Sequence, residues 1–235
     1  MNREIVVTAD GSHSISIPGM NATYHSRHGA VQESMHVFIE AGFRYVAPRF
    51  ADNEPIHIFE MGLGTGLNVL LTAIEAEGSG QPVYYETIDA FPLDTTQTDQ
   101  LNYCEQLQRP DLMPLFRQVH HSGWNEVTEL NPFFRFKKSR LDLPAYLGQQ
   151  PPATGNTGIN LIYFDAFSPD IQPELWTSAI FTGLFSRMAP GGILVTYCSK
   201  TVVRRAMQEG GLQVNKIPGP YGKREMLRAV KNPVV

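Results

Sequence analysis

The stretch IFEMGLGTGLNVL, residues 58–70, places three glycines between an apolar run and the start of a helical pattern. The glycines occupy every second position, at Gly62, Gly64 and Gly66. Glycines in a turn from strand to helix let the backbone approach a ligand closely, and the helix N-terminus attracts anionic groups. The spacing is not the dinucleotide pattern G-x-G-x-x-G, and the Gly-Lys-Ser/Thr of a P-loop is absent. The stretch therefore predicts a different ligand loop, with a merely glycine-rich structural turn as the alternative.

Strand and helix patterns alternate around this loop. Apolar runs predict strands over residues 55–62, 82–91, 133–140, 160–167, 191–199, 211–217 and 224–230. Helical spacing predicts helices over residues 65–78, 143–148, 173–189 and 201–210, while residues 93–131 are expected to be mostly helix and loop. This alternation predicts an α/β fold with a doubly wound, mostly parallel sheet of seven strands, in which the last two form an antiparallel hairpin.

The first 50 residues precede this pattern. Two short alternating runs around Asp10-Gly11 predict a β-hairpin, and apolar spacing predicts a helix from about His28 that ends at Gly42. We therefore expect an N-terminal hairpin and helix extension over residues 1–50, packed on a core domain over residues 51–235.

The composition indicates a globular protein with a full core. Of the 235 residues, 42% are apolar and 18% are charged. No apolar run is long enough for a membrane span, the N-terminus lacks a signal-peptide pattern, and Cys104 and Cys198 form no metal or redox motif. We expect a cytoplasmic protein with no membrane and no metal.

The charge is unevenly distributed along the chain. The net charge is −4, but from Thr196 onward eight basic residues face two acidic ones, which leaves −10 for the rest. A basic cluster can contact phosphates, and it can equally be a solvated face. Charge alone favours the solvated face.

The loop together with Glu60, which ends the strand before it, has the pattern acid-x-G-x-G-x-G. This pattern resembles the S-adenosylmethionine loop of class I methyltransferases, which fits a ligand that carries a carboxylate and an ammonium group. Since a doubly wound sheet binds ligands at the carboxyl ends of its strands, Asp89 is placed to bind ribose hydroxyls, unless it caps the next helix. Asp142 is a candidate for the adenine, and an N-cap role explains it equally well.

FDAFSPDIQPELW, residues 164–176, begins with Asp165 at the end of a central strand. This position faces the crevice in which the methyl group of the cofactor would lie. Methyl transfer to an amine requires a neutral nitrogen whose lone pair points at the methyl group. A carboxylate there can accept the N–H bonds, orient the nitrogen and take its proton, while the prolines stiffen the turn. Capping of the following helix is the weaker explanation of Asp165.

Several longer segments carry a more specific resemblance. YHSRHGAVQESMHVFIEAG, FEMGLGTGLNVL, IDAFPL, FDAFSPDIQPELW and MAPGGILVTYCSKTVVRRAMQEGGLQVNKIPGPYGKREML follow one another between residues 24 and 230. Together they resemble the methyltransferase domain of the bifunctional enzymes that make 5-methylaminomethyl-2-thiouridine at the wobble position of tRNA. The chain departs from the family pattern at Ala166, where glycine is usual, and over residues 93–131.

The resemblance implies methyl transfer from S-adenosylmethionine to the primary amine of 5-aminomethyl-(2-thio)uridine. It also implies roles for residues at matching positions. Glu60, Gly62, Gly64 and Gly66 would hold the methionine moiety, Asp89 the ribose, and Asp165 would face the amine. Phe167 and Pro169 would shape the acceptor pocket, and the closing motif would supply Tyr221, Lys223 and Arg224. The chain ends at Val235 without a second domain, so we expect no FAD and none of the oxidoreductase activity.

The resemblance also changes the interpretation of the basic tail. We expect Arg204 and Arg205, after the fifth core strand, to contact phosphates of a tRNA anticodon stem-loop whose wobble base enters the pocket. Trp124 is more simply explained by packing. One alternative is methylation, or aminopropyl transfer, on another small amine, although a polyamine site would favour acidic residues. Another is a non-catalytic binding module, which would have no use for Asp165.

Overall fold

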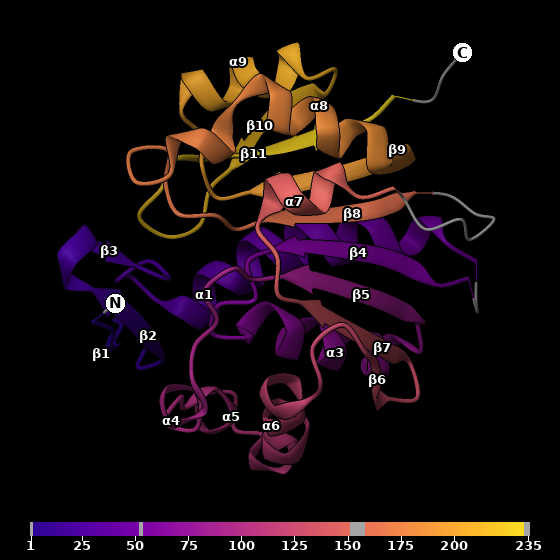
Figure 1. The fold of residues 1–235 in the computed structure, drawn as a ribbon. Coiled ribbons are helices and arrows are strands. Elements are labelled where there is room, and N and C mark those ends of the chain that lie inside the picture. Colours follow the sequence, from indigo (N-terminus) through magenta and orange to yellow (C-terminus); the bar gives the residue numbers. More distant parts are fainter. Residues whose placement is uncertain (1, 52–53, 151–157, 233–235) are drawn as a thin grey trace.

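The computed structural model describes residues 2–51, 54–150 and 158–232. Its central sheet has the strand order β10-β11-β9-β8-β4-β5-β7-β6 (Figure 1). The strands, in chain order, are β4 (Ile56–Met61), β5 (Val83–Ile88), β6 (Val127–Asn131), β7 (Phe134–Ser139), β8 (Ile159–Phe164), β9 (Met188–Thr196), β10 (Gln213–Pro218) and β11 (Glu225–Val230). β7, β5, β4, β8 and β9 are parallel neighbours. The predicted parallel sheet and its closing β10–β11 hairpin are confirmed.

The sheet has eight strands rather than the seven predicted. The additional strand is β6, which pairs antiparallel with β7 at one edge. It lies in the region 93–131, which otherwise holds the short helices α4 (Thr95–Thr98), α5 (Tyr103–Gln106) and η4 (Pro110–Leu112), followed by α6 (Met113–His121). Since most of its side chains reach solvent, β6 lacks the apolar run that marks the other strands.

Helices cover both faces of the sheet. On one face, α7 (Leu143–Gly148), α8 (Ser178–Arg187) and α9 (Thr201–Glu209) share an apolar cluster with sheet residues such as Phe59 and Leu194, and the short η5 (Pro173–Trp176) joins them. On the other face, α3 (Leu67–Ser79), α6 and the π-helix η2 (Met35–Phe43) pack on residues such as Ile58 and Tyr85. The alternation of Ile58 and Phe59 between the two clusters follows from the pleat of β4.

The N-terminal region forms a separate three-stranded sheet and a long helical segment. β1 (Glu4–Val7), β2 (His13–Ile17) and β3 (Ala22–Thr23) are antiparallel, with η1 (Pro18–Met20) between the last two. They lie beside the end of the central sheet toward which β4 and β5 run (Figure 1). The helical segment runs through α1 (Ala30–Ser34), η2, α2 (Arg44–Val46) and η3 (Ala47–Arg49).

The prediction that this helix ends at Gly42 is wrong, because the helical segment continues to Arg49. A Cβ at Gly42 would lie 3.0 Å from the Tyr163 ring, so the glycine permits close packing on the sheet rather than ending the helix. In the described parts of the chain, no helix has the length and apolarity to cross a membrane.

Candidate functional site

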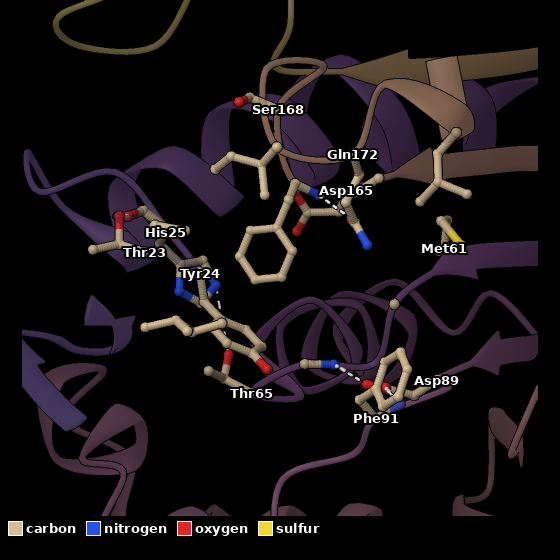
Figure 2. A pocket seen from close by; sticks show the side chains of 18 of the residues that line it. Thr23, Tyr24, His25, Met61, Thr65, Asp89, Phe91, Asp165, Ser168 and Gln172 are labelled. Carbon is tan, nitrogen blue, oxygen red and sulfur yellow. Dashed lines mark hydrogen bonds between the residues drawn. The ribbon is translucent and has the colours of Figure 1, made fainter. Parts of the chain in front are cut away.

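A cavity of about 640 Å³ opens at the carboxyl ends of the parallel strands. Its walls include the loops that follow β4, β5, β8 and β9, and the turn between β10 and β11. The N-terminal segment supplies the facing wall, with residues that include Thr23, Tyr24 and His25 (Figure 2). The volume is typical of a site for a small molecule.

The three glycines of the loop have different surroundings. Gly62 lines the cavity, and a Cβ there would meet no atom closer than 3.8 Å, so the space beside it is open. A Cβ at Gly64 would lie 3.1 Å from the Tyr24 ring. Gly66 does not line the cavity; it has a φ of +73° before α3, and a Cβ there would lie 2.8 Å from His120 Nε2. The prediction that all three hold the cofactor therefore needs correction at Gly66, which serves the turn.

Glu60 also fails to reach the cavity, contrary to its predicted contact with the methionine moiety. It is 1% exposed and lies under α3, where its Oε1 accepts a hydrogen bond from Asn68 Nδ2 at 2.9 Å. Burial raises the pKa of Glu60 well above its usual range, which favours the uncharged acid. Asn68 does line the cavity, and its Nδ2 also donates to Asp165 Oδ2 at 3.0 Å. Glu60 thus acts on the site through Asn68.

Asp165 is placed as predicted, at the end of β8 on the cavity wall (Figure 2). Burial is the main cause that raises its pKa to about 7, and the carboxylate of Glu33 adds to the effect. The hydrogen bond from Asn68 and the charge of Lys223 act in the opposite direction. A carboxyl with this pKa can hold or release a proton near neutral pH, which suits a group that faces an amine.

Asp89 and Asp142 also line the cavity, as predicted. The Asp89 carboxylate accepts hydrogen bonds from the backbone N–H of Gly64 at 3.0 Å and of Phe91 at 2.8 Å (Figure 2). Each oxygen keeps a free lone pair, so the group can still accept bonds from ribose hydroxyls. Asp142 caps α7 by accepting from the backbone N–H of Ala145 at 2.7 Å, so both readings of this residue are compatible with the structure.

The N-terminal segment contributes side chains that the sequence did not predict. The Tyr24 ring meets Phe167 edge-on, with their centroids 5.2 Å apart, and both line the cavity. His25 is buried behind Tyr24, where its Nδ1 lies 3.1 Å from Ser14 Oγ, and burial lowers its pKa to about 4. Uncharged His25 and the two aromatic rings form an uncharged part of this wall. Phe167 lines the cavity, and its predicted role in the acceptor pocket stays a prediction.

Lys223 reaches the cavity from the turn between β10 and β11. Its Nζ donates to Glu33 Oε1 of α1 and lies 4.2 Å from the centre of the Tyr197 ring. Glu33, Tyr197 and Asn68 are wall residues that sequence reasoning missed. Glu33 lies in the quoted segment YHSRHGAVQESMHVFIEAG, which is the only signal that could have indicated it.

The other residues predicted to bind substrate do not line the cavity. Tyr221 is 70% exposed and packs edge-on against His28, and Arg205 and Arg224 are exposed. These residues, together with the half-buried Pro169 and Arg204, lie outside the cavity wall. Trp124 is half-buried and packs against the core, as predicted. The centre of its ring lies 4.9 Å from Lys138 Nζ.

Comparison with known proteins shows which sequences and structures this chain is similar to. Residues 123–232 match the model of a family described as S-adenosyl-L-methionine-dependent methyltransferase. The match covers slightly less than half of the chain and is a similarity to that methyltransferase family. The resemblance expected from the sequence is thereby confirmed, including the cofactor class.

A second similarity covers most of the chain and is to bifunctional proteins. The chain is 31% identical over 214 residues to the tRNA 5-methylaminomethyl-2-thiouridine biosynthesis bifunctional protein MnmC of Nitrosospira multiformis, which covers 87% of this chain and 33% of that protein. For the protein of the same name from Cupriavidus metallidurans the identity is 29%, over 92% of this chain and 32% of that protein. The chain thus spans about a third of the length of these relatives.

The solved structure of MNMC2 from Aquifex aeolicus has the same fold. It superposes with a TM-score of 0.75 at 23% identity, over 100% of this chain and 72% of that one. The α/β methyltransferase fold expected from the sequence is confirmed. The methyltransferase cofactor fits the residues that are present, because the cavity is open beside Gly62 and two carboxylates with free acceptor capacity, Asp89 and Asp165, lie at its wall.

Proposed function

We propose that this chain transfers a methyl group from S-adenosylmethionine to the primary amine of 5-aminomethyl-(2-thio)uridine at the wobble position of tRNA. The single observation that carries the proposal is the position of Asp165, beside the glycine loop on the wall of a cavity with an apolar side. The names of the bifunctional relatives support the choice of acceptor. From this activity on tRNA we also infer a cytoplasmic location.

The side chains of this methyltransferase have distinct tasks. S-adenosylmethionine, when bound, supplies a methyl group whose carbon–sulfur bond breaks, its electron pair staying on sulfur, as the amine nitrogen forms the new carbon–nitrogen bond. Asp89 binds the ribose hydroxyls. Asp165, oriented by Asn68, accepts an N–H bond of the amine and aims the nitrogen lone pair. It is also placed to take the proton that the nitrogen releases after transfer.

The acceptor base enters beside the pair of aromatic side chains Tyr24 and Phe167. Phe167 and Tyr24 are half-buried at the cavity and offer faces and edges for an extruded wobble uracil. The anticodon stem-loop then lies across the rim, where the exposed Arg205 and Arg224 and the half-buried Arg204 contact its phosphates. Tyr221 is an exposed stacking partner for a neighbouring base.

Nucleoside analysis tests the proposal directly. The protein is incubated with methyl-labelled S-adenosylmethionine and tRNA that carries the aminomethyl group, and the wobble nucleoside is analysed by mass spectrometry. We expect label in 5-methylaminomethyl-(2-thio)uridine and none in tRNA that lacks the aminomethyl group. Label in a free small amine, with none in tRNA, would support the alternative of a different amine acceptor instead.

A further inference from the structure

The ion pair between Glu33 and Lys223 is a built part of the cavity wall, and the roles described so far make no use of its charge. Both side chains line the cavity, with side-chain exposures of 11% for Glu33 and 32% for Lys223. Glu33 is further held by its Oε2, which accepts a bond from the backbone N–H of Ser26 at 2.8 Å. The face of Tyr197 lies against Lys223 Nζ. These contacts fix the two opposite charges of the pair on the cavity wall.

Lys223 and Glu33 line the same cavity as Asp165. The hydroxyl of Tyr197, which packs on Lys223, donates to the carbonyl of Ala166 at 2.9 Å, one residue after Asp165. Glu33 raises the pKa of Asp165 and Lys223 lowers it, and the effect of Glu33 is the larger of the two. The titratable groups around Lys223 are Glu33 from α1, His28 before α1, Asp165 after β8, and Tyr197 and Cys198 after β9.

An amine acceptor raises a problem that Asp165 cannot solve alone. A primary alkyl amine resembles a lysine side chain, which is protonated at neutral pH with a pKa of about 10.4. A neighbouring carboxylate stabilises this ammonium form, whose nitrogen has no lone pair for the methyl group. A fixed positive charge nearby has the opposite effect on both groups.

We propose that Lys223, held by Glu33 and Tyr197, offsets the negative charge of Glu33 and so disfavours an additional proton on the acceptor amine and Asp165. The proton leaves the ammonium nitrogen, so that R–NH3⁺ becomes R–NH2, and it passes to cavity water. The bound state then has a neutral amine beside an ionised carboxylate. This inference rests on the proposed function, since it requires a primary amine as acceptor.

The test is the dependence of kcat on pH, because kcat reports the ionisation of groups in the enzyme–substrate complex. The rate of methyl transfer to tRNA that carries the aminomethyl group is measured between pH 5.5 and 10 with both substrates saturating. We expect the Lys223→Met variant to move the acidic limb of the profile upward by about one unit or more, which is a loss of about tenfold below the limb. Lys223→Arg should restore the position of the limb.

The Glu33→Gln variant should move the same limb to lower pH, because it removes a negative charge from the site. The decisive observation is that the acidic limb of the kcat profile moves in opposite directions in Lys223→Met and Glu33→Gln. A pair that merely fastens the β10–β11 turn to α1 would lose activity equally in both variants at every pH, with no shift of the limb, and that result would overturn the inference. Lys216→Met is the matched control, since Lys216 forms an ion pair with Glu225 in the same hairpin outside the cavity wall; its limb should stay in place.

Two further outcomes are informative. Wild-type protein that does not methylate this tRNA would refute the proposed function, and the inference would fall with it. A wild type that is active, with variants whose limbs do not move, would refute the inference alone. If Lys223→Met fails to fold, the opposite shifts are sought in Lys223→Gln and Glu33→Gln.

Discussion

Replacing Asp165 by Asn should stabilise the cofactor-free protein, and the gain should grow with pH. Burial raises the pKa of Asp165 from 3.8 to about 7. A carboxyl with a raised pKa binds its proton more tightly in the folded chain than in the unfolded one. Its ionisation therefore costs nothing well below pH 4, costs more as the pH rises, and reaches its full cost once the pH exceeds 7.

The shift sets the size of the effect. About 3 pKa units at 1.36 kcal/mol each give an upper limit of about 4 kcal/mol in the free energy of unfolding. Of this, about 2.5 kcal/mol develops between pH 5 and pH 8. Asn has no proton to lose, and its side-chain oxygen can still accept the bond from Asn68 Nδ2. The variant should therefore keep the local geometry and lose only the cost of the charge.

Urea unfolding of both proteins at pH 5, 6.5 and 8, without cofactor, measures this difference. The free energy gained by Asp165→Asn should increase by roughly 2–3 kcal/mol from pH 5 to pH 8. Asp170→Asn is the control, because that carboxylate is 73% exposed five residues further along the chain; it should not show the gain. An equal difference at all three pH values would mean that the folded protein ionises Asp165 as freely as the unfolded chain does, and the reasoning about its burial would be refuted.

Three other experiments test the site and its supports. Asp165→Ala should abolish methyl transfer while S-adenosylmethionine affinity, measured by calorimetry, changes little; normal transfer would show that the amine needs no carboxylate. Charge reversal at Arg204 and Arg205 should weaken tRNA binding and flatten its dependence on salt, and an unchanged salt slope would make them a solvated face. Gly66→Ala should destabilise the protein by at least about 1–2 kcal/mol, since its φ is +73° and His120 blocks the Cβ. Gly78→Ala, at an open position of α3, should instead be neutral or stabilising by thermal unfolding.

The parts of the fold that the sequence predicted are those with strong local patterns. β4, β5 and β8 are apolar runs because both of their faces are covered by helices. Asp89 and Asp165 directly follow β5 and β8, so their positions at the sheet edge could be predicted. β6 was missed because an edge strand needs no apolar run. Its pairing with β7 is visible only once the partner is in place.

The facing wall of the cavity could not be predicted in the same way. Tyr24 and Glu33 precede the glycine loop, and no local pattern states that their segment folds back over the crevice. The contact between Glu33 and Lys223 joins residues 190 positions apart. Such a contact depends on how the N-terminal segment and the last hairpin meet, which is a property of the whole fold. A resemblance that covers both segments can point to them, but it does not give their geometry.

Glu60 shows how a correct motif led to a wrong role. An acid just before the glycines suggested a direct contact with the cofactor, but the pleat of β4 turns this side chain under α3, where it is buried. Asn68, the second residue of that helix, joins Glu60 to Asp165 through a single amide nitrogen. Since burial favours the uncharged form of Glu60, the amide group of Asn68 is oriented without a second negative charge beside the amine. Glu60, the acid of the motif, thus positions Asp165, the acid that faces the cavity. Asn68, which the motif does not specify, links the two side chains.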